Sequence, residues 1–231
     1  MTTVTIKLEV PGGPDARVLL HACCAPCSGA IVETMVAQGI RPTIFWSNSN
    51  IYDKAEYDKR KAEILRYSEK FGLEVVDDDY DHAAWLKEAA AGLENEPERG
   101  SRCAACFAWR LSRAARYAAA HGFTVLATTL ASSRWKSLEQ VDAAGRNACE
   151  AVNGRAALPS DFPGRWEQKG PKTSVPSGFS GRWEQSGCSP VIWWGQNWRI
   201  CGLQPRRSEI IREQNFYNQD FCGCEFSIRN K

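Results

Sequence analysis

Seven of the ten cysteines in this chain fall into three short clusters. The clusters are Cys23-Cys24-Ala25-Pro26-Cys27, Cys103-Ala104-Ala105-Cys106 and Cys222-Gly223-Cys224. Thiols gathered at one site bind iron–sulfur clusters, zinc or copper, or they exchange disulfides. Adjacent Cys23 and Cys24 are expected to point in diverging directions, which suits a multi-iron cluster better than one small tetrahedral ion. The clusters therefore predict a metal or redox protein.

Length and composition limit the class of protein. The chain has 231 residues, of which 43% are hydrophobic and 24% charged, as in a water-soluble globular protein. The N-terminus lacks the pattern of a signal peptide, and no apolar run reaches the roughly 18 residues of a membrane span. We therefore expect a cytoplasmic protein. In a reducing compartment, ten cysteines favour metal or redox chemistry over structural disulfides.

The charge pattern says little about nucleic acid. A net charge of +2 creates no global basic field. Basic residues do collect in the last third of the chain, either as a local binding patch or as a solvated face. These residues are Arg199, Arg206, Arg207, Arg212, Arg229 and Lys231.

Predicted strands alternate with predicted helices as far as residue 152. Strands are expected at 17–21, 43–46, 73–76 and 123–130, and helices at 28–38, 54–71, 83–93, 103–121 and 137–152. This order predicts βαβ units and a mainly parallel sheet. Open parallel sheets bind their ligands at the carboxyl ends of the strands, and residues 23–27 and 128–136 follow strands there. Cys103 lies at a helix start, where the helix dipole stabilises a thiolate.

The remaining chain is divided differently. Residues 153–190 are rich in Gly, Pro, Ser and Trp, and the segment 162–168 recurs at 179–185 around a shared Arg-Trp-Glu-Gln sequence. We interpret this stretch as a surface insertion or a mobile loop. Order returns at 191–194, and a helix is expected from 205 or 208 to 216. We predict one metalloenzyme domain, 1–231, with an α/β core at about 15–152, the insertion at about 153–190, and a C-terminal segment, 191–231, that folds back onto the metal site.

The cysteine pattern alone leaves several functions open. Two Cys-x-x-Cys-like pairs can form a four-thiolate zinc site, so a non-catalytic zinc or iron–sulfur nucleic-acid-binding protein is one alternative. A thiol–disulfide oxidoreductase working through Cys103 and Cys106 is another. The number of clustered thiols, and His21 at the mouth of a parallel sheet, favour a site for chemistry. No Gly-x-Gly-x-x-Gly motif supports direct binding of a nicotinamide cofactor.

Several motifs together resemble one known family. They are Leu19-Leu20-His21-Ala22-Cys23-Cys24-Ala25-Pro26-Cys27, Asn48-x-Asn50-Ile51 with Glu56-Tyr57 and Arg60, Arg102-Cys103-x-x-Cys106 continuing to Arg110-Leu111, Thr128-Thr129-Leu130 with Ser133-x-x-Lys136, and Tyr217-x-Gln219-x-Phe221-Cys222-Gly223-Cys224-x-Phe226-Ser227. This ordered set resembles the epoxyqueuosine reductase QueH family from about residue 17 to 227. Each motif alone is weak, whereas the ordered set is specific.

The resemblance implies a fold, a reaction and partners. The fold would be a HUP-like (PP-loop-like) α/β parallel sheet with flanking helices. The protein would be a cytosolic, cobalamin-independent oxidoreductase that reduces epoxyqueuosine at the wobble position of tRNA to queuosine, a two-electron reductive deoxygenation. The implied partners are tRNA with a GUN anticodon and an electron donor such as ferredoxin or flavodoxin, with no membrane.

The resemblance also implies roles for single residues. Cys23, Cys24, Cys103 and Cys106 would bind a 4Fe-4S cluster. Cys27, Cys222 and Cys224 would bind an adjacent mononuclear iron or another metal, or act as redox thiols. All seven cysteines are thus candidate metal ligands. His21 and Lys136 are candidate proton donors, and His21 alternatively supports the cluster loop through hydrogen bonds.

Other polar residues are candidates for contacts with tRNA. Lys136, as an alternative to donating a proton, could bind phosphate or ribose together with the hydroxyl groups of Thr128, Thr129, Ser132 and Ser133. The arginines expected to contact the anticodon loop are Arg102, Arg110 and Arg113, because a wobble nucleotide splayed out of its loop must be held near the centre.

The sequence departs from the family pattern in places. Arg134 and Trp135 stand where the family usually has proline and tyrosine, and the segment 198–202 replaces a more basic stretch. Three cysteines, Cys149, Cys188 and Cys201, have no family counterpart. We expect Cys149 to be a small core residue.

Overall fold

The computed structural model describes residues 2–154 and 190–228, which form a parallel sheet of five strands in the order β3-β2-β1-β4-β5. The strands are β1 (Val18–His21), β2 (Thr43–Trp46), β3 (Val75–Asp77), β4 (Val125–Thr128) and β5 (Ile192–Trp193). Every neighbouring pair runs parallel. The central strands β1 and β4 are buried along their whole length, as expected for strands covered on both faces.

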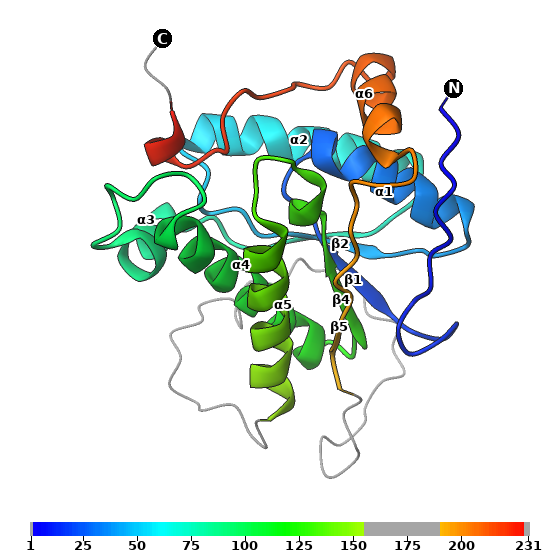
Figure 1. The fold of residues 1–231 in the computed structure, drawn as a ribbon, viewed down its shortest axis with the longest axis horizontal. Coiled ribbons are helices and arrows are strands. Elements are labelled where there is room, and N and C mark those ends of the chain that lie inside the picture. Colours follow the sequence, from blue (N-terminus) through cyan, green and yellow to red (C-terminus); the bar gives the residue numbers. More distant parts are fainter. Residues whose placement is uncertain (1, 155–189, 229–231) are drawn as a thin grey trace, which may run out of the picture.

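Helices cover both faces of the sheet (Figure 1). One face carries α1 (Ala25–Ala37) and α2 (Lys54–Lys70), with α6 (Leu203–Glu213) packed on α1. The other face carries α4 (Ser101–Ala120) and α5 (Leu138–Asn153), which pack on each other. The short helix α3 (His82–Trp85) lies between β3 and α4 in the chain. The predicted fold class, an α/β parallel sheet with flanking helices, is confirmed.

Local sequence signals place the helix starts. Pro26 lies in the first turn of α1, where its missing N–H is not needed. The side chain of Asp53 caps α2 by accepting a hydrogen bond of 3.0 Å from the backbone N of Glu56. Ser137 caps α5 through the backbone N of Gln140 at 3.2 Å. These caps fix where the loops at the carboxyl end of the sheet pass into helices.

Some predicted element bounds were wrong. The strand expected at 123–130 ends at Thr128, because the Thr128 hydroxyl accepts from Leu130 N and starts a 3-10 turn over Thr129–Ser132. The helix expected at 83–93 is split into α3 and a π-helical turn at Leu86–Ala90. The third strand lies at Val75–Asp77 instead of 73–76.

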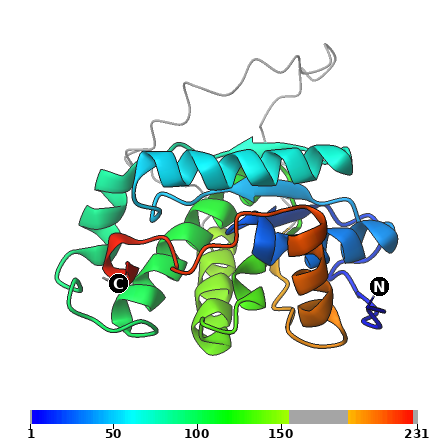
Figure 2. The same ribbon diagram turned by 90° about the horizontal axis from the view of Figure 1, so that it is seen from above.

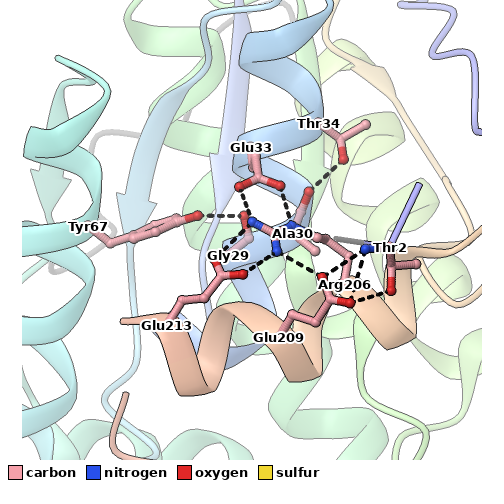
Figure 3. A network of polar contacts seen from close by, with 9 residues as sticks. All are labelled: Thr2, Gly29, Ala30, Glu33, Thr34, Tyr67, Arg206, Glu209 and Glu213. Carbon is pink, nitrogen blue, oxygen red and sulfur yellow. Dashed lines mark hydrogen bonds and ion pairs between the residues drawn. The ribbon is translucent and has the colours of Figure 1, made fainter. Parts of the chain in front are cut away.

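A cluster of ion pairs anchors α6 to α1 (Figure 3). The guanidinium of Arg206 in α6 bonds both carboxylate oxygens of Glu33 in α1, at 2.6 and 2.8 Å, and also reaches Glu209 and Glu213. Arg206 is only 3% exposed and its guanidinium bonds carboxylates of the protein, so both alternatives, a binding patch and a solvated face, are wrong for this residue. Thr2 joins the cluster by donating its backbone N–H to Glu209.

The C-terminal segment turns back across the molecule after α6. Figures 1 and 2 show it running from α6 along α2 toward α3. Arg60 in α2 donates to the carbonyl oxygen of Cys222 at 3.1 Å, and the carbonyl of Gly223 accepts from Tyr52 N at 2.8 Å. The ring of Phe226 packs on that of Trp85 in α3. These contacts bring Cys222 and Cys224 back to the α/β core.

Some sequence predictions fall outside the described part of the chain. They are the repeat at 162–168 and 179–185, Cys188, Arg229 and Lys231. Among the described helices, none has the length and apolar character needed to cross a membrane.

Candidate functional site

Three cysteines converge in the turn between β1 and α1. The Sγ atoms of Cys23, Cys24 and Cys27 all lie within 4.8 Å of one another, and all three side chains are buried. The expectation that Cys23 and Cys24 diverge is wrong, because their Sγ atoms are 4.0 Å apart. The extended backbone of Cys24, with φ −176° and ψ 163°, turns the chain from the strand into the helix at this point.

The pKa values of the three thiols are shifted in different directions. Hydrogen bonds from Cys24 and Cys27, assisted by the charges of Lys136 and Arg110, hold the pKa of Cys23 well below its ordinary value. Hydrogen bonds with Cys23 and with Cys27 raise the pKa of Cys24, and the bond with Cys23 raises the pKa of Cys27 to about 11. A buried set that stabilises one thiolate with two further thiols beside it has the donor chemistry of a soft-metal site.

Lys136 supplies a positive charge to this set. Its Nζ atom lies 4.0 Å from Cys23 Sγ. Burial disfavours the ammonium form, but the combined charges of the neighbouring thiolates, Cys23 foremost, outweigh burial and raise the pKa of Lys136. Lys136 therefore keeps its proton at neutral pH and faces the cysteine cluster as a cation.

His21 is a support of the cysteine loop. Its side chain is 0% exposed, and burial together with the charge of Arg110 lowers the pKa of His21 to about 3. Nε2 donates to the carbonyl oxygen of Ser47 at 3.2 Å, because a carbonyl only accepts. Nδ1 therefore accepts from the Thr128 hydroxyl at 2.8 Å. A neutral ring with both nitrogens bonded fits the alternative in which His21 supports the cysteine loop, and its role as a proton donor stays a prediction.

Hydroxyl groups after β4 also hold this loop. Thr129 Oγ1 accepts from Cys23 N at 3.0 Å and lies 3.4 Å from Cys23 Sγ. Thr128, Thr129 and Ser132 are buried, so the predicted contact of Thr128 and Thr129 with phosphate or ribose is wrong. Ser132 and Ser133 do line the cavity described next.

A cavity of about 650 Å³ opens beside the cysteine turn. Its wall combines Cys27 with Cys103, Cys222 and Cys224. Cys106 is outside the lining and belongs to a buried cluster with Cys224 and Trp85. The residues that line the cavity come from the start of α4, the loop after β4, α6 and the C-terminal segment. Besides the cysteines, they are Glu98, Arg99, Arg102, Phe107, Ser132, Ser133, Arg134, Trp135, Lys136, Gln204, Pro205, Arg207, Ser208, Asn218, Gln219, Asp220, Phe221 and Ser227.

The thiols of the second and third clusters have different surroundings. Cys103 is half-buried and its Sγ accepts from Arg99 N at 3.2 Å, while Cys222 is exposed. Burial raises the pKa of Cys106 to about 12 and also raises the pKa values of Cys103 and Cys224. These three thiols therefore keep their protons at neutral pH unless a bound metal displaces them. Among the described residues, the thiols that lie close enough together to share a metal ion are those of Cys23, Cys24 and Cys27, and this buried set could bind a metal.

The arginines predicted to contact tRNA bond the protein instead. Arg110 is 2% exposed, and its guanidinium bonds the carbonyl of Ser47 and the side chain of Asn48. Arg113 forms a two-point ion pair with Asp78, with both bonds at 2.6 Å. The prediction is wrong for these two residues. Arg102 also binds backbone carbonyls, yet it borders the cavity.

Two further arginines shape the site without a sequence signal. Arg99 and Arg199 donate to backbone carbonyls of residues 131–136, the loop that carries Lys136. Their partners are backbone atoms distant in the sequence, which no motif reveals. The predicted core position of Cys149 is confirmed, since it is buried on α5. Cys201 is exposed and lies outside the cavity lining.

Fold and site together define an α/β protein with a thiol-rich pocket at the carboxyl ends of parallel strands. The model of the family described as "Epoxyqueuosine reductase QueH" matches residues 18–179 and 180–230. A relative of that name from Haemophilus influenzae is 38% identical over 97% of this chain and 76% of its own length. One from Acinetobacter baylyi is 38% identical over 100% and 88%, and one from Thermotoga maritima is 24% identical over 91% and 90%. The chain belongs to the epoxyqueuosine reductase QueH family.

Proposed function

We propose that this protein reduces the epoxide of epoxyqueuosine in tRNA to the alkene of queuosine, at the wobble position of a GUN anticodon and without cobalamin. The observation that carries the proposal is the 38% identity, over nearly the whole chain, to proteins named epoxyqueuosine reductase QueH. The thiol-lined cavity supports it, because open α/β sheets bind ligands at the carboxyl ends of their strands.

The seven clustered thiols would hold the metal centre. Cys23, Cys24, Cys103 and Cys106 are the proposed ligands of a 4Fe-4S cluster. Cys27, Cys222 and Cys224 would hold an adjacent mononuclear iron or another metal, or act as redox thiols. When bound, such a centre supplies electrons and polarises the epoxide oxygen. A donor protein such as ferredoxin or flavodoxin would deliver the electrons.

The overall reaction breaks both C–O bonds of the epoxide, forms a carbon–carbon double bond, and takes up two electrons and two protons to release water. Lys136, which lines the cavity with its Nζ 4.0 Å from Cys23 Sγ, would donate a hydrogen bond to the oxygen as negative charge develops there. His21, a neutral ring whose Nε2–H is bonded to the carbonyl of Ser47, would hold the cysteine turn beside β4 through its bond with Thr128.

We further propose that residues 1–231 act as one metalloenzyme unit. The support is the composition of the cavity wall, which joins residues of the α/β core with residues of the C-terminal segment. Neither part alone would present all seven thiols.

The reaction is tested with anaerobically purified protein, dithionite and tRNA carrying epoxyqueuosine, followed by mass spectrometry of the digested nucleosides. We expect queuosine to appear with the wild type and not with Cys103→Ala. A protein that retains its iron and leaves the epoxide intact would contradict the proposal.

A further inference from the structure

We propose that Trp135 is a stacking platform that holds an unpaired RNA base at the mouth of the thiol cavity. The inference rests on the proposed function, because it names how the same site receives a single-stranded tRNA loop. It concerns a residue that departs from the family pattern and that the chemistry described above does not use.

The indole of Trp135 is unusually exposed for its position. It lines the cavity, yet 63% of its surface is accessible, more than any other large hydrophobic side chain among the described residues. A single exposed hydrophobic residue needs no explanation by itself. The explanation is needed here because the loop around Trp135 is held firmly while the ring is left uncovered.

Two guanidinium groups fix the backbone of this loop. Arg99 donates to the carbonyl oxygens of Trp135 and Arg134, at 2.9 and 2.7 Å. From the other side, Arg199 donates to the carbonyls of Ala131 and Lys136, at 2.9 and 2.7 Å, and to that of Ser133. A loop pinned at five carbonyls presents its aromatic ring with little further loss of conformational entropy on binding.

Two adjacent side chains of this loop, those of Trp135 and Lys136, lie in different environments. Lys136 reaches inward to within 4.0 Å of Cys23 Sγ, while the adjacent Trp135 stays at the exposed rim. A nucleotide whose side group enters the cavity toward Lys136 would thus have a neighbouring base at the indole. Unstacked bases of RNA loops are commonly held on aromatic rings in this way.

The charge and polarity around the ring match RNA. Five basic side chains and two acidic ones line the cavity, an excess of positive charge suited to phosphates. The Arg134 guanidinium lies 5.0 Å from the Trp135 ring centroid, an arrangement that adds a cation beside the stacking surface. Within the part of the chain that the structure describes, Arg207 Nε and Gln219 Oε1 are buried without a hydrogen-bond partner. Both residues line the cavity.

The test compares RNA binding and catalysis in anaerobic, iron-loaded protein. The variants are Trp135→Ala, Trp135→Phe and, as a matched control, Leu65→Ala, an exposed apolar residue on α2 outside the cavity lining. One probe is a fluorescein-labelled anticodon stem-loop RNA with a GUN loop, and the other is the stem duplex alone. Binding is followed by fluorescence anisotropy, and turnover by nucleoside mass spectrometry on tRNA carrying epoxyqueuosine.

We expect Trp135→Ala to weaken stem-loop binding by about tenfold or more, since stacking contributes substantially per base. Trp135→Phe should retain most of the affinity, and Leu65→Ala should match the wild type. The loss in turnover should fall on KM more than on kcat, with unchanged iron content. Duplex binding, which offers no unpaired base, should be the same for all variants.

Two results would overturn the inference. One is stem-loop binding by Trp135→Ala within about twofold of the wild type, which is too small for a lost stacking contact. The other is an equal loss for stem-loop and duplex, which would indicate a general charge effect. Failure of the proposed reaction is recognised separately, because it appears as an absence of queuosine with the wild type itself, whatever Trp135→Ala does to RNA binding.

Discussion

The ammonium nitrogen of Lys136 lies 4.0 Å from the Sγ atom of Cys23, although 113 residues separate the two in sequence. Parallel pairing of β1 with β4 makes this approach possible, because Cys23 and Lys136 both follow the carboxyl ends of those neighbouring strands. A cation is thereby placed beside the buried turn where three thiols converge.

We predict that the charge of Lys136 supports metal binding by these thiols. Lys136→Met should lower iron affinity by about 10- to 100-fold, as is typical when a partner of a metal ligand is lost. Lys136→Arg, which keeps the positive charge, should bind iron nearly as well as the wild type. Chelator competition on anaerobic protein measures the difference, and equal affinities for Met and wild type would contradict the prediction.

We predict that substituting a cysteine of the cavity wall lowers bound iron and activity, whereas substituting a cysteine outside the cavity does not. Cys103→Ser replaces a thiol of the cavity wall and should lower both bound iron and queuosine formation to near background. Cys201→Ser changes an exposed thiol outside that lining and should leave both unchanged. Iron and sulfide analysis of the two variants beside the wild type is the measurement. A Cys103→Ser protein with full iron content would remove Cys103 from the ligand set.

We predict that the ion-pair cluster around Arg206 makes the stability of the folded protein fall as the pH becomes acidic. Hydrogen bonds from Thr2 and then Arg206 lower the pKa of Glu209 from 4.5 to about 2. A lowered carboxyl pKa means that this stabilisation is complete above about pH 4.5 and is lost as pH falls toward 2. Arg206→Met should therefore lower the urea midpoint at pH 7, with the deficit shrinking across that window.

Arg212→Met is the matched control, because Arg212 is exposed on the same helix. Its urea midpoint should stay close to that of the wild type. If both substitutions had equal effects at pH 7, the interhelical ion pair with Glu33 would contribute nothing measurable.

Packing between α5 and β5 gives a prediction independent of the metal. A Cβ atom on Gly145 would lie 2.3 Å from the ring of Trp193, whose Nε1 is held by Asp142 at 2.6 Å. Gly145→Ala should destabilise the protein by about 1–3 kcal/mol through overpacking. Gly154→Ala, whose Cβ would meet its nearest atom at 3.4 Å, should stay within about 0.5 kcal/mol. Thermal unfolding that ranks the two variants equally would count against the close contact.

Sequence patterns predicted those features whose signals are local. The strand β2 was predicted with its observed bounds, because a short apolar run between turn residues marks a buried strand. The predicted bounds of its neighbour β3 differed from the observed ones. Only three residues of β3 pair with β2, and because they are partly exposed, the apolar pattern that marks this strand in the sequence is weak. The cysteine turn was found because close spacing of thiols is visible in the chain itself.

Long-range polar contacts could not be predicted in this way. The burial of Arg110 and Arg206 depends on partners that only the fold brings near. The sequence alone therefore does not show whether an arginine side chain will contact RNA or a polar group of the protein itself. The same holds for Arg99 and Arg199, which bind backbone carbonyls that every residue possesses.

The most direct test of the account relates queuosine formation to bound iron in the same protein preparations. Samples reconstituted to graded iron contents are given dithionite and tRNA carrying epoxyqueuosine, and the initial rate of queuosine formation is measured for each. The account predicts a rate that rises with bound iron and vanishes in metal-free protein. A metal-free protein that reduces the epoxide as fast as the iron-loaded one would contradict it.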